Sequence, residues 1–158
     1  MNSAADHSPD QPLLNAFLTT DYLVRLGEQC LKVRIGHRHP VLDQLLENRQ
    51  WAILTAANPG ATGLSARVNE ERHRILADQA RLADVATLPT INRDPTGRWP
   101  DEHGLLLIAP ARPWLLEQAR RFEQIGLVHG QAGLAAELWL LGTRLDAGDH
   151  EHIRVVTP

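Results

Sequence analysis

The sequence predicts an α/β (α+β) fold, a single domain in which about three helices pack on a mixed β-sheet. Hydrophobic residues make up 43% of the 158 residues, which is enough to build the core of one domain. Short apolar runs typical of strands alternate with segments whose apolar residues recur at helical spacing. The expected order, ββαβαββαββ, contains too few strand-helix-strand units for a fully parallel sheet, so both strand orientations are expected.

The domain is expected to occupy residues 12–142. Residues 1–11 are polar and have neither the basic nor the apolar region of a secretory signal, so they are interpreted as a disordered leader. Residues 143–158 are predicted to form a polar C-terminal tail or an edge strand, with the strand at residues 153–156.

The first half of the domain is expected to open with a short helix or an extended entry at residues 13–20. Residues 21–26 and 31–35 then form two strands of a hairpin. Pro40 suits the first position of a helix. In that helix one face carries the apolar side chains of Val41, Leu42, Leu45 and Leu46.

Residues 51–57 form a short, continuous apolar run that predicts a buried, central strand. Ser65 is the expected N-cap of a helix that extends to about residue 83. Residues 85–91 and 105–109 predict two further strands, which form a hairpin with a long, structured tip. The apolar stripe of the predicted helix consists of Val68, Ile75, Leu76, Leu82 and Ala83.

Pro89 lies inside the first of these two strands and favours an edge strand or a bulge, because proline has no N–H to donate. Pro113 opens a helix that extends to about residue 123. Residues 126–129 and 134–141 predict a second hairpin. The side chains expected to point inward from the Pro113 helix are Leu116, Ala119 and Phe122.

Composition limits the classes of function. The net charge of −3 and the pI near 6.2 show no basic surface for nucleic acid, which is therefore an unlikely partner. No segment reaches the roughly 18 apolar residues of a membrane span, so no membrane partner is expected. A single cysteine, Cys30, excludes internal disulfides and cysteine-rich zinc sites and fits a cytoplasmic location. Oligomeric state is not determined by the sequence.

No metal and no other cofactor is expected. The eight histidines include two local pairs, His37 with His39 and His150 with His152. Neither pair is accompanied by a cysteine pair or by an H-E-x-x-H motif, so neither has the pattern of a metal site.

The strongest candidate site is the junction at which the apolar run 51–57 ends in Asn58 and leads to the helix that begins after Ser65. Such a junction directs backbone N–H groups and the helix dipole toward a ligand. Asn69 and Arg72 follow Ser65 at helical spacing and line one side of the helix. Amide groups and one guanidinium suit a small anionic ligand, a carboxylate or a phosphate.

A second loop supplies the remaining candidate residues. Trp99 offers a surface for stacking, and Glu102 or His103 offers a group for proton transfer. Of these two, Glu102 is the candidate catalytic residue, and His103 is expected to have a structural role. The alternative is wholly structural, with Asn58 in an Asx turn and Arg72 paired with Glu102 or Asp101. Whether the chain is an enzyme stays open.

Four motifs support a resemblance to a known family. They read W-x-x-x-T-A-x-N-P-G, S-x-x-x-N-x-x-R, W-P-[DE]-E-x-G and R-R-F-x-Q. Together they resemble a bacterial family of domains of unknown function, over about positions 13–141. The resemblance implies a small cytoplasmic protein and assigns no activity. The family's recurrent positions match Trp51, Thr55, Asn58, Pro59, Asn69, Arg72, Trp99, Glu102, Arg121, Phe122 and Gln124. The chain departs from the pattern after Gln124, where the family more often has a polar residue.

Three classes of function follow. The first is an α/β domain that binds a small molecule or a nucleotide, in a pocket between the Asn58 loop, the Ser65 helix and the Trp99 loop. The second is a non-catalytic interaction module with an exposed apolar strip at residues 134–141. The third is nucleobase or nucleic-acid processing, because Asn-Pro-Gly followed by Ser and Asn-x-x-Arg partly resembles the first motif of uracil-DNA glycosylases. No second motif of those enzymes is found.

Overall fold

The computed structural model describes residues 11–142 and 148–157 of the chain. In this part eight strands form one sheet, in the order β2-β1-β4-β5-β3-β6-β7-β8. Neighbouring strands are antiparallel except β7 and β8, which are parallel, so the predicted mixed sheet is confirmed. The strands are β1 (Asp21–Leu26), β2 (Gln29–Val33), β3 (Trp51–Leu54), β4 (Thr87–Arg93), β5 (Glu102–Ile108), β6 (Gly126–Gly130), β7 (Glu137–Leu141) and β8 (Ile153–Val156).

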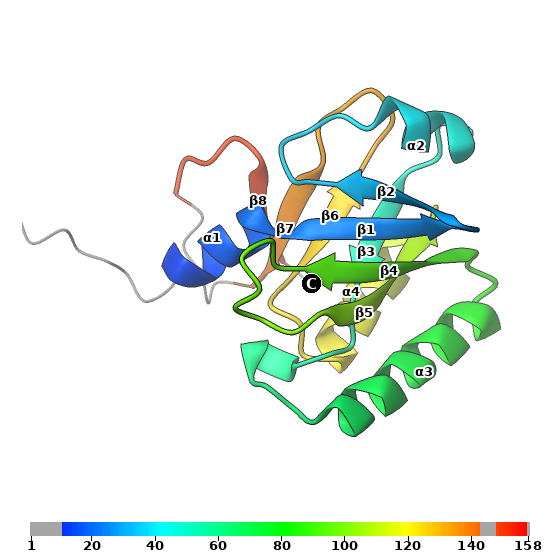
Figure 1. Cartoon of the computed structure of the whole chain (residues 1–158). Helices are drawn as coiled ribbons and strands as arrows, with labels where there is room; N and C mark the ends of the chain where they lie inside the picture. Colours follow the sequence, from blue (N-terminus) through cyan, green and yellow to red (C-terminus); the bar gives the residue numbers. More distant parts are fainter. Residues whose placement is uncertain (1–10, 143–147, 158) are drawn as a thin grey trace, which may run out of the picture.

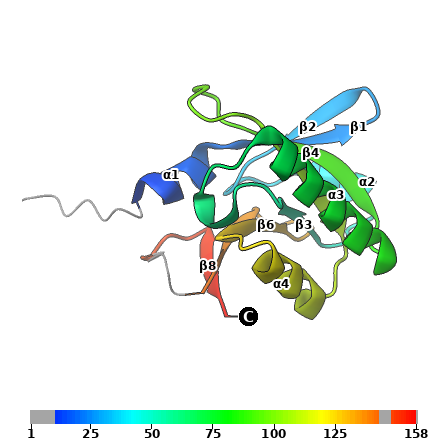
Figure 2. The ribbon, with the colours of Figure 1, turned by 90° about the horizontal axis from the view of Figure 1, so that it is seen from below.

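Helices cover both faces of the sheet (Figures 1 and 2). One face packs against α1 and α2, in a cluster that includes Leu14 and Leu42. The other face packs against α3 and α4, in a cluster that includes Leu76 and Leu115. The described residues thus form a three-layer domain, whose helices are α1 (Gln11–Thr19), α2 (Pro40–Leu45), the short 3-10 helix η1 (Pro59–Ala61), α3 (Ala66–Leu82) and α4 (Arg112–Arg121).

The central strand of the sheet is β3, and all four of its residues are buried. It pairs with β5 on one side and β6 on the other. A run of four buried residues needs apolar neighbours on both faces, and here the two helical layers supply them. The prediction of a buried, central strand at this position is confirmed, although the strand ends at Leu54 and residues 55–57 already belong to the following loop.

The hairpin predicted on either side of residue 97 is formed by β4 and β5. β4 is an internal strand, so the prediction that Pro89 pushes it to the sheet edge is wrong for the strand as a whole. Pro89 nevertheless pairs with Leu105 of β5 and lies beyond Thr90, where the pairing of β4 with β1 ends. Proline is tolerated there because one side of the strand is free of a ladder partner.

Some predicted apolar faces are wrong. Of the four residues predicted to form the apolar face of α2, Leu42 and Leu46 are buried, Leu46 just beyond the end of the helix, whereas Val41 and Leu45 are exposed. In α3 the inward positions run from Asn69 through Leu76 to Ala80, so Ile75 and Leu82 point outward. Each helix buries a narrower stripe than the apolar pattern suggested. The reason is that the helix packs on one face of the sheet only, so its outer side is exposed to solvent.

The strip at residues 134–141 is not an exposed apolar surface. β7 lies between β6 and β8, and Leu138 and Leu140 are buried. Leu134, at 56% exposure, lies in the preceding loop. The sequence-based expectation of an exposed docking strip is therefore wrong, because Leu138 and Leu140 pack into a hydrophobic cluster on one face of the sheet and β8 occupies the edge of β7.

Candidate functional site

The candidate site lies at the end of the sheet where β3 ends and β5 begins. Figure 1 shows η1, α1 and the β4–β5 loop gathered at this end, and Figure 2 shows the same arrangement from below. Thr55 fixes the first turn after β3, because its Oγ1 donates to the carbonyl of His103 and accepts from the N–H of Ala57. The chain then reaches Asn58, which has φ 49°. Asparagine tolerates this left-handed conformation better than most residues.

Asn58 and Asn69 bind each other twice. The backbone N–H of Asn58 donates to Oδ1 of Asn69 over 3.0 Å, and Nδ2 of Asn69 donates to Oδ1 of Asn58 over 2.8 Å. The same Oδ1 of Asn58 accepts from the N–H of Leu64. The two asparagines thus tie the loop to the first turn of α3.

Glu102 is the third member of this network. Nδ2 of Asn58 donates to Oε1 of Glu102 over 2.6 Å. Oε2 of Glu102 has no partner among the described residues. One carboxylate oxygen therefore positions Asn58 while the other stays available.

Ser65 is the N-cap of α3. Its hydroxyl oxygen accepts from the N–H of Val68 over 3.3 Å, and its backbone is extended, with φ −62° and ψ 153°. This is the geometry in which a serine side chain satisfies one of the first free N–H groups of a helix. The predicted N-cap is confirmed, and the helix begins one residue later.

Arg72 has different partners from those expected. Its Nε donates to the carbonyl of Ala56 over 2.6 Å, and its Nη2 donates to the carbonyl of Phe122 over 2.8 Å. The guanidinium carbon also lies 5.6 Å from the centre of the Phe122 ring. The structural alternative that paired Arg72 with Glu102 or Asp101 is wrong. Glu102 binds Asn58, and Asp101 forms an ion pair with Arg93 over 2.8 Å.

The charge of Arg72 is consequently not neutralised by a carboxylate among the described residues. Two of its three nitrogens are bound to carbonyls, and Nη1 has no partner in this part of the chain. The side chain is half-buried. A half-buried guanidinium that lacks a counterion is a favourable place for an anion, because hydrogen bonds to ionised groups are stronger than those between neutral groups.

The residues at the end of α4 complete the network. Nε2 of Gln124 donates to the carbonyls of Ala57 and Phe122, over 2.9 and 3.0 Å. The N–H of Gly60 donates to the carbonyl of Glu123 over 2.7 Å. The four motifs, which are far apart in the sequence, therefore meet in one hydrogen-bonded cluster around the Asn58 loop.

Trp99 lies in the β4–β5 loop and is 64% exposed. The loop is held by Asp94, whose carboxylate accepts from Thr96, from the N–H of Arg98 and from the N–H of Trp99. These bonds to the charged form lower the pKa of Asp94, the bond from the N–H of Thr96 contributing most. The loop is ordered by its own contacts, which leaves the Trp99 indole uncovered.

Two residues that the sequence did not single out lie beside Glu102. Tyr22, Asn92 and Glu102 are register partners across β1, β4 and β5. Burial, and then the charge of Glu102, raises the pKa of the Tyr22 phenol above its usual value. Oδ1 of Asn92 is buried without a partner among the described residues. Only the strand register reveals this row, because the residues are separated by whole loops in the sequence.

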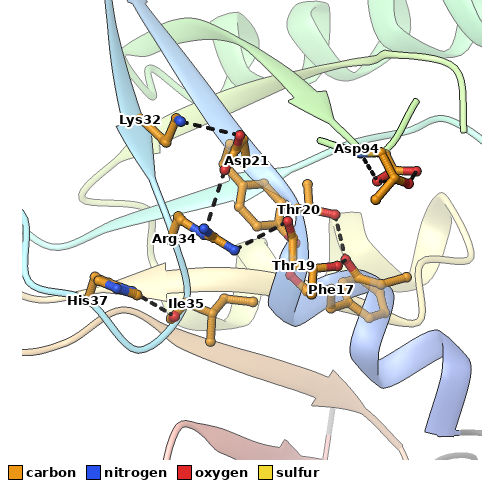
Figure 3. Close-up of polar contacts among 12 residues, drawn as sticks. Phe17, Thr19, Thr20, Asp21, Lys32, Arg34, Ile35, His37 and Asp94 are labelled. Carbon is orange, nitrogen blue, oxygen red and sulfur yellow. Dashed lines mark hydrogen bonds and ion pairs between the residues drawn. The ribbon is translucent and has the colours of Figure 1, made fainter. Parts of the chain in front are cut away.

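A second polar cluster lies at the same end of the sheet, on β1 and β2 (Figure 3). Asp21, which is 9% exposed, lies 3.4 Å from Nζ of Lys32 and 3.6 Å from Nε of Arg34. Nη2 of Arg34 lies 3.5 Å from the carbonyl of Thr19 at the end of α1. The single carboxylate of Asp21 thus faces two cations, and these contacts fasten α1 and β2 to the start of β1.

A cavity of about 630 Å³ adjoins the site. It is not between the Asn58 loop, the Ser65 helix and the Trp99 loop, where the sequence predicted a pocket. It lies on the α4 side of η1, and neither Arg72 nor Glu102 lines it. The lining residues are Pro59, Gly60, Thr62, Leu116, Arg120, Glu123, Gln124, Ile125, Leu141 and Gly142.

Neither histidine pair is part of a larger group. Within residues 11–142 and 148–157, no three histidine, cysteine, aspartate or glutamate side chains are arranged to hold a metal ion. The same part of the chain contains no helix with the length and apolar character of a membrane span.

The fold and the site define a three-layer α/β domain whose four sequence motifs form one polar junction at a sheet end. In a comparison with protein families, residues 54–127, slightly less than half of the chain, match the family described as Protein of unknown function (DUF3293). The family of unknown function expected from the sequence is thus found, and the matched stretch contains every motif residue except Trp51. A comparison with curated proteins found no match, and a comparison with solved structures found none either.

Proposed function

We propose that this chain binds a small anionic molecule, a carboxylate or a phosphate, at the junction between the Asn58 loop and α3. The observation that carries the proposal is the state of Arg72, which holds a fixed guanidinium without a counterion among the described residues. Bonds from Nε and Nη2 set its orientation, so Nη1 is left to bind a ligand. The site residues of the proposal are Asn58, Ser65, Asn69, Arg72 and Trp99, with Glu102 beside them.

The other residues have distinct roles in this proposal. Asn58 and Asn69 hold the loop against the helix, and Ser65 defines the helix end whose dipole favours negative charge. Trp99 offers an exposed ring for stacking. If the ligand is a substrate, the free Oε2 of Glu102 is the group that accepts a proton.

This proposal is favoured over the two other classes of function. The interaction module required an exposed apolar strip on β7, which is buried. The relation to uracil-DNA glycosylase-like sites stays a prediction, and so does a cytoplasmic location. A nucleotide is compatible with the same site, because its phosphate would bind Arg72 and its base would stack on Trp99.

A thermal-shift titration with inorganic phosphate, succinate and adenosine monophosphate tests the proposal. At ligand concentrations about a hundredfold above Kd, binding raises the stability of the folded state by about 2.7 kcal/mol. We expect at least one of the three to raise the Tm of the wild-type protein and of Arg74→Gln, which alters an exposed arginine of the same helix.

The variant Arg72→Gln is expected to lose the ligand-dependent rise, measured against its own Tm without ligand. This comparison separates binding from the stability that Arg72 contributes through its two carbonyl bonds. The proposal is overturned if none of the anions raises the wild-type Tm, or if Arg72→Gln responds as the wild type does.

A further inference from the structure

The cavity beside η1 has the size of a ligand site, and nothing in the proposed anion site uses it. Its volume of about 630 Å³ lies within the range of roughly 300–1,000 Å³ that is usual for small-molecule pockets. All of its lining residues except Leu141 and Gly142 fall inside the stretch 54–127 that matches the family. The cavity is therefore built mainly from the family's own segment.

Part of the cavity lining is apolar. Leu116 projects from α4, Ile125 precedes β6, and Leu141 ends β7. Leu116 is 8% exposed, and the other two are half-buried. Pro59 adds a further apolar surface from η1. This part of the lining suits branched aliphatic groups, which gain free energy in proportion to the apolar area that they bury.

The mouth of the cavity carries one charge of each sign. Arg120 and Glu123 both line it, both are exposed, and neither side chain has a hydrogen bond or an ion pair among the described residues. Oε1 of Gln124 is also without a partner there, since Nε2 makes both bonds of that side chain. The mouth thus offers a guanidinium to an anion, and a carboxylate and an amide oxygen to a cation.

The position of Glu123 is fixed by its backbone. Its φ is 54°, and its carbonyl accepts from the N–H of Gly60 across the cavity wall. The Cα of Glu123 therefore has a defined place beside the apolar lining residues, and its exposed carboxylate extends from there.

We infer that this cavity binds a zwitterionic molecule with an apolar body, an aliphatic amino acid or a short aliphatic peptide. The ligand's carboxylate binds Arg120, its ammonium group binds Glu123, and its aliphatic side chains contact Leu116, Ile125 and Leu141. This inference does not depend on the anion site at Arg72, because no side chain of that site lines the cavity.

The test measures the binding of leucyl-leucine and of two analogues that each lack one charge. Binding is detected by two-dimensional NMR of the full chain. N-acetyl-leucyl-leucine has no ammonium group, and leucyl-leucinamide has no carboxylate. We expect leucyl-leucine to shift the methyl signals of Leu116, Ile125 and Leu141, and each analogue to bind roughly tenfold more weakly, as expected when one charged hydrogen bond is lost.

Substitutions of two exposed residues then show which side chain binds each charge of the ligand. Arg120→Gln should weaken leucyl-leucine but leave leucyl-leucinamide unchanged, and Glu123→Gln should weaken leucyl-leucine but leave the N-acetyl form unchanged. The matched controls are Arg121→Gln and Glu117→Gln, which alter exposed residues of α4 that do not line the cavity.

The inference is overturned if leucyl-leucine at millimolar concentration leaves the three methyl signals unmoved, or if all three ligands bind equally well to wild type and variants. A failure of the anion site would be seen separately, because phosphate would then leave the side-chain amide signals of Asn58 and Asn69 unchanged. The cavity and the anion site are therefore tested separately, because their binding shifts the NMR signals of different residues.

Discussion

Asn58 and Asn69 exchange hydrogen bonds in both directions, so that the loop after β3 and the first turns of α3 share one pair of amide groups. The two residues are 11 positions apart in the chain. This reciprocal pair ties the Asn58 loop to α3.

Replacing Asn69 by alanine should destabilise the protein by about 2 kcal/mol, because the half-buried N–H of Asn58 loses its acceptor. Urea denaturation measures the free energy of unfolding. Glu70→Ala, the exposed neighbour, should change it by less than about 0.5 kcal/mol. Equal effects of the two substitutions would show that the reciprocal pair contributes no stability.

Ser65→Ala should lower the free energy of unfolding by about 1 kcal/mol, because the N–H of Val68 loses the hydroxyl that caps it. Ser65→Asp should keep most of the stability, since aspartate caps a helix equally well. Thermal unfolding of the three proteins checks this order. An alanine variant as stable as the aspartate variant would contradict the role of the cap.

Gly130→Ala should destabilise the protein by about 3 kcal/mol or more, because a Cβ at this position would overlap the indole ring of Trp51. Trp51 is 2% exposed and has no room to move away. Gly63→Ala is the control, since a Cβ there meets nothing within 4 Å. The measurement is chemical denaturation. If both variants unfolded at the same denaturant concentration, the close contact between residue 130 and Trp51 would be contradicted.

His129 should make stability depend on pH. It stacks on Trp139 with ring centres 4.0 Å apart, and burial lowers its pKa to about 4 from an ordinary value of 6.5. Between these two values the unfolded chain binds a proton that the folded chain does not, so stability falls as the pH decreases from 6.5 to about 4.

The measurement compares unfolding free energies of wild type and His129→Gln at pH 7.5, 6.0, 5.0 and 4.5. Burial also lowers the pKa of His39 and His73, so both proteins lose stability in acid, and the difference between them isolates His129. The wild type should lose more stability than the variant. Parallel curves for the two proteins would contradict the lowered pKa.

The sequence alone predicted the elements and several local features. Residues 21–26 are a strand as expected, and Ser65 caps its helix. Each depends on interactions between residues a few positions apart, which sequence patterns record directly. The inward-pointing residues of α4 were also predicted correctly, because Leu116 and Ala119 follow the helical period.

The sequence was wrong where the outcome depends on which elements become neighbours. Leu82 has the spacing of a core residue but is 73% exposed, because α3 extends past the sheet that it covers. The strip on β7 was expected to be exposed, yet β8 pairs with it. Hydrophobic periodicity tells which face of an element is apolar and not how much of that face is covered.

In the candidate site, too, the sequence predicted local features but not the contacts between distant elements. The motifs located Asn58, Asn69 and Arg72 from their spacing, but they did not locate the partners of Arg72. One of those partners is the carbonyl of Phe122, 50 residues further along the chain. A backbone carbonyl carries no signature of residue type, so no sequence pattern distinguishes it from a carboxylate partner.

By itself, the sequence determined the order of helices and strands, the capped start of α3 and the group of polar residues that meets after β3. Only the tertiary structure decided that Arg72 has no carboxylate partner in the described part of the chain, that Glu102 binds Asn58, and that a cavity opens beside η1. The physical reason is that local hydrogen bonds and periodicity act within one element. Charge compensation and cavities depend on how several elements pack together.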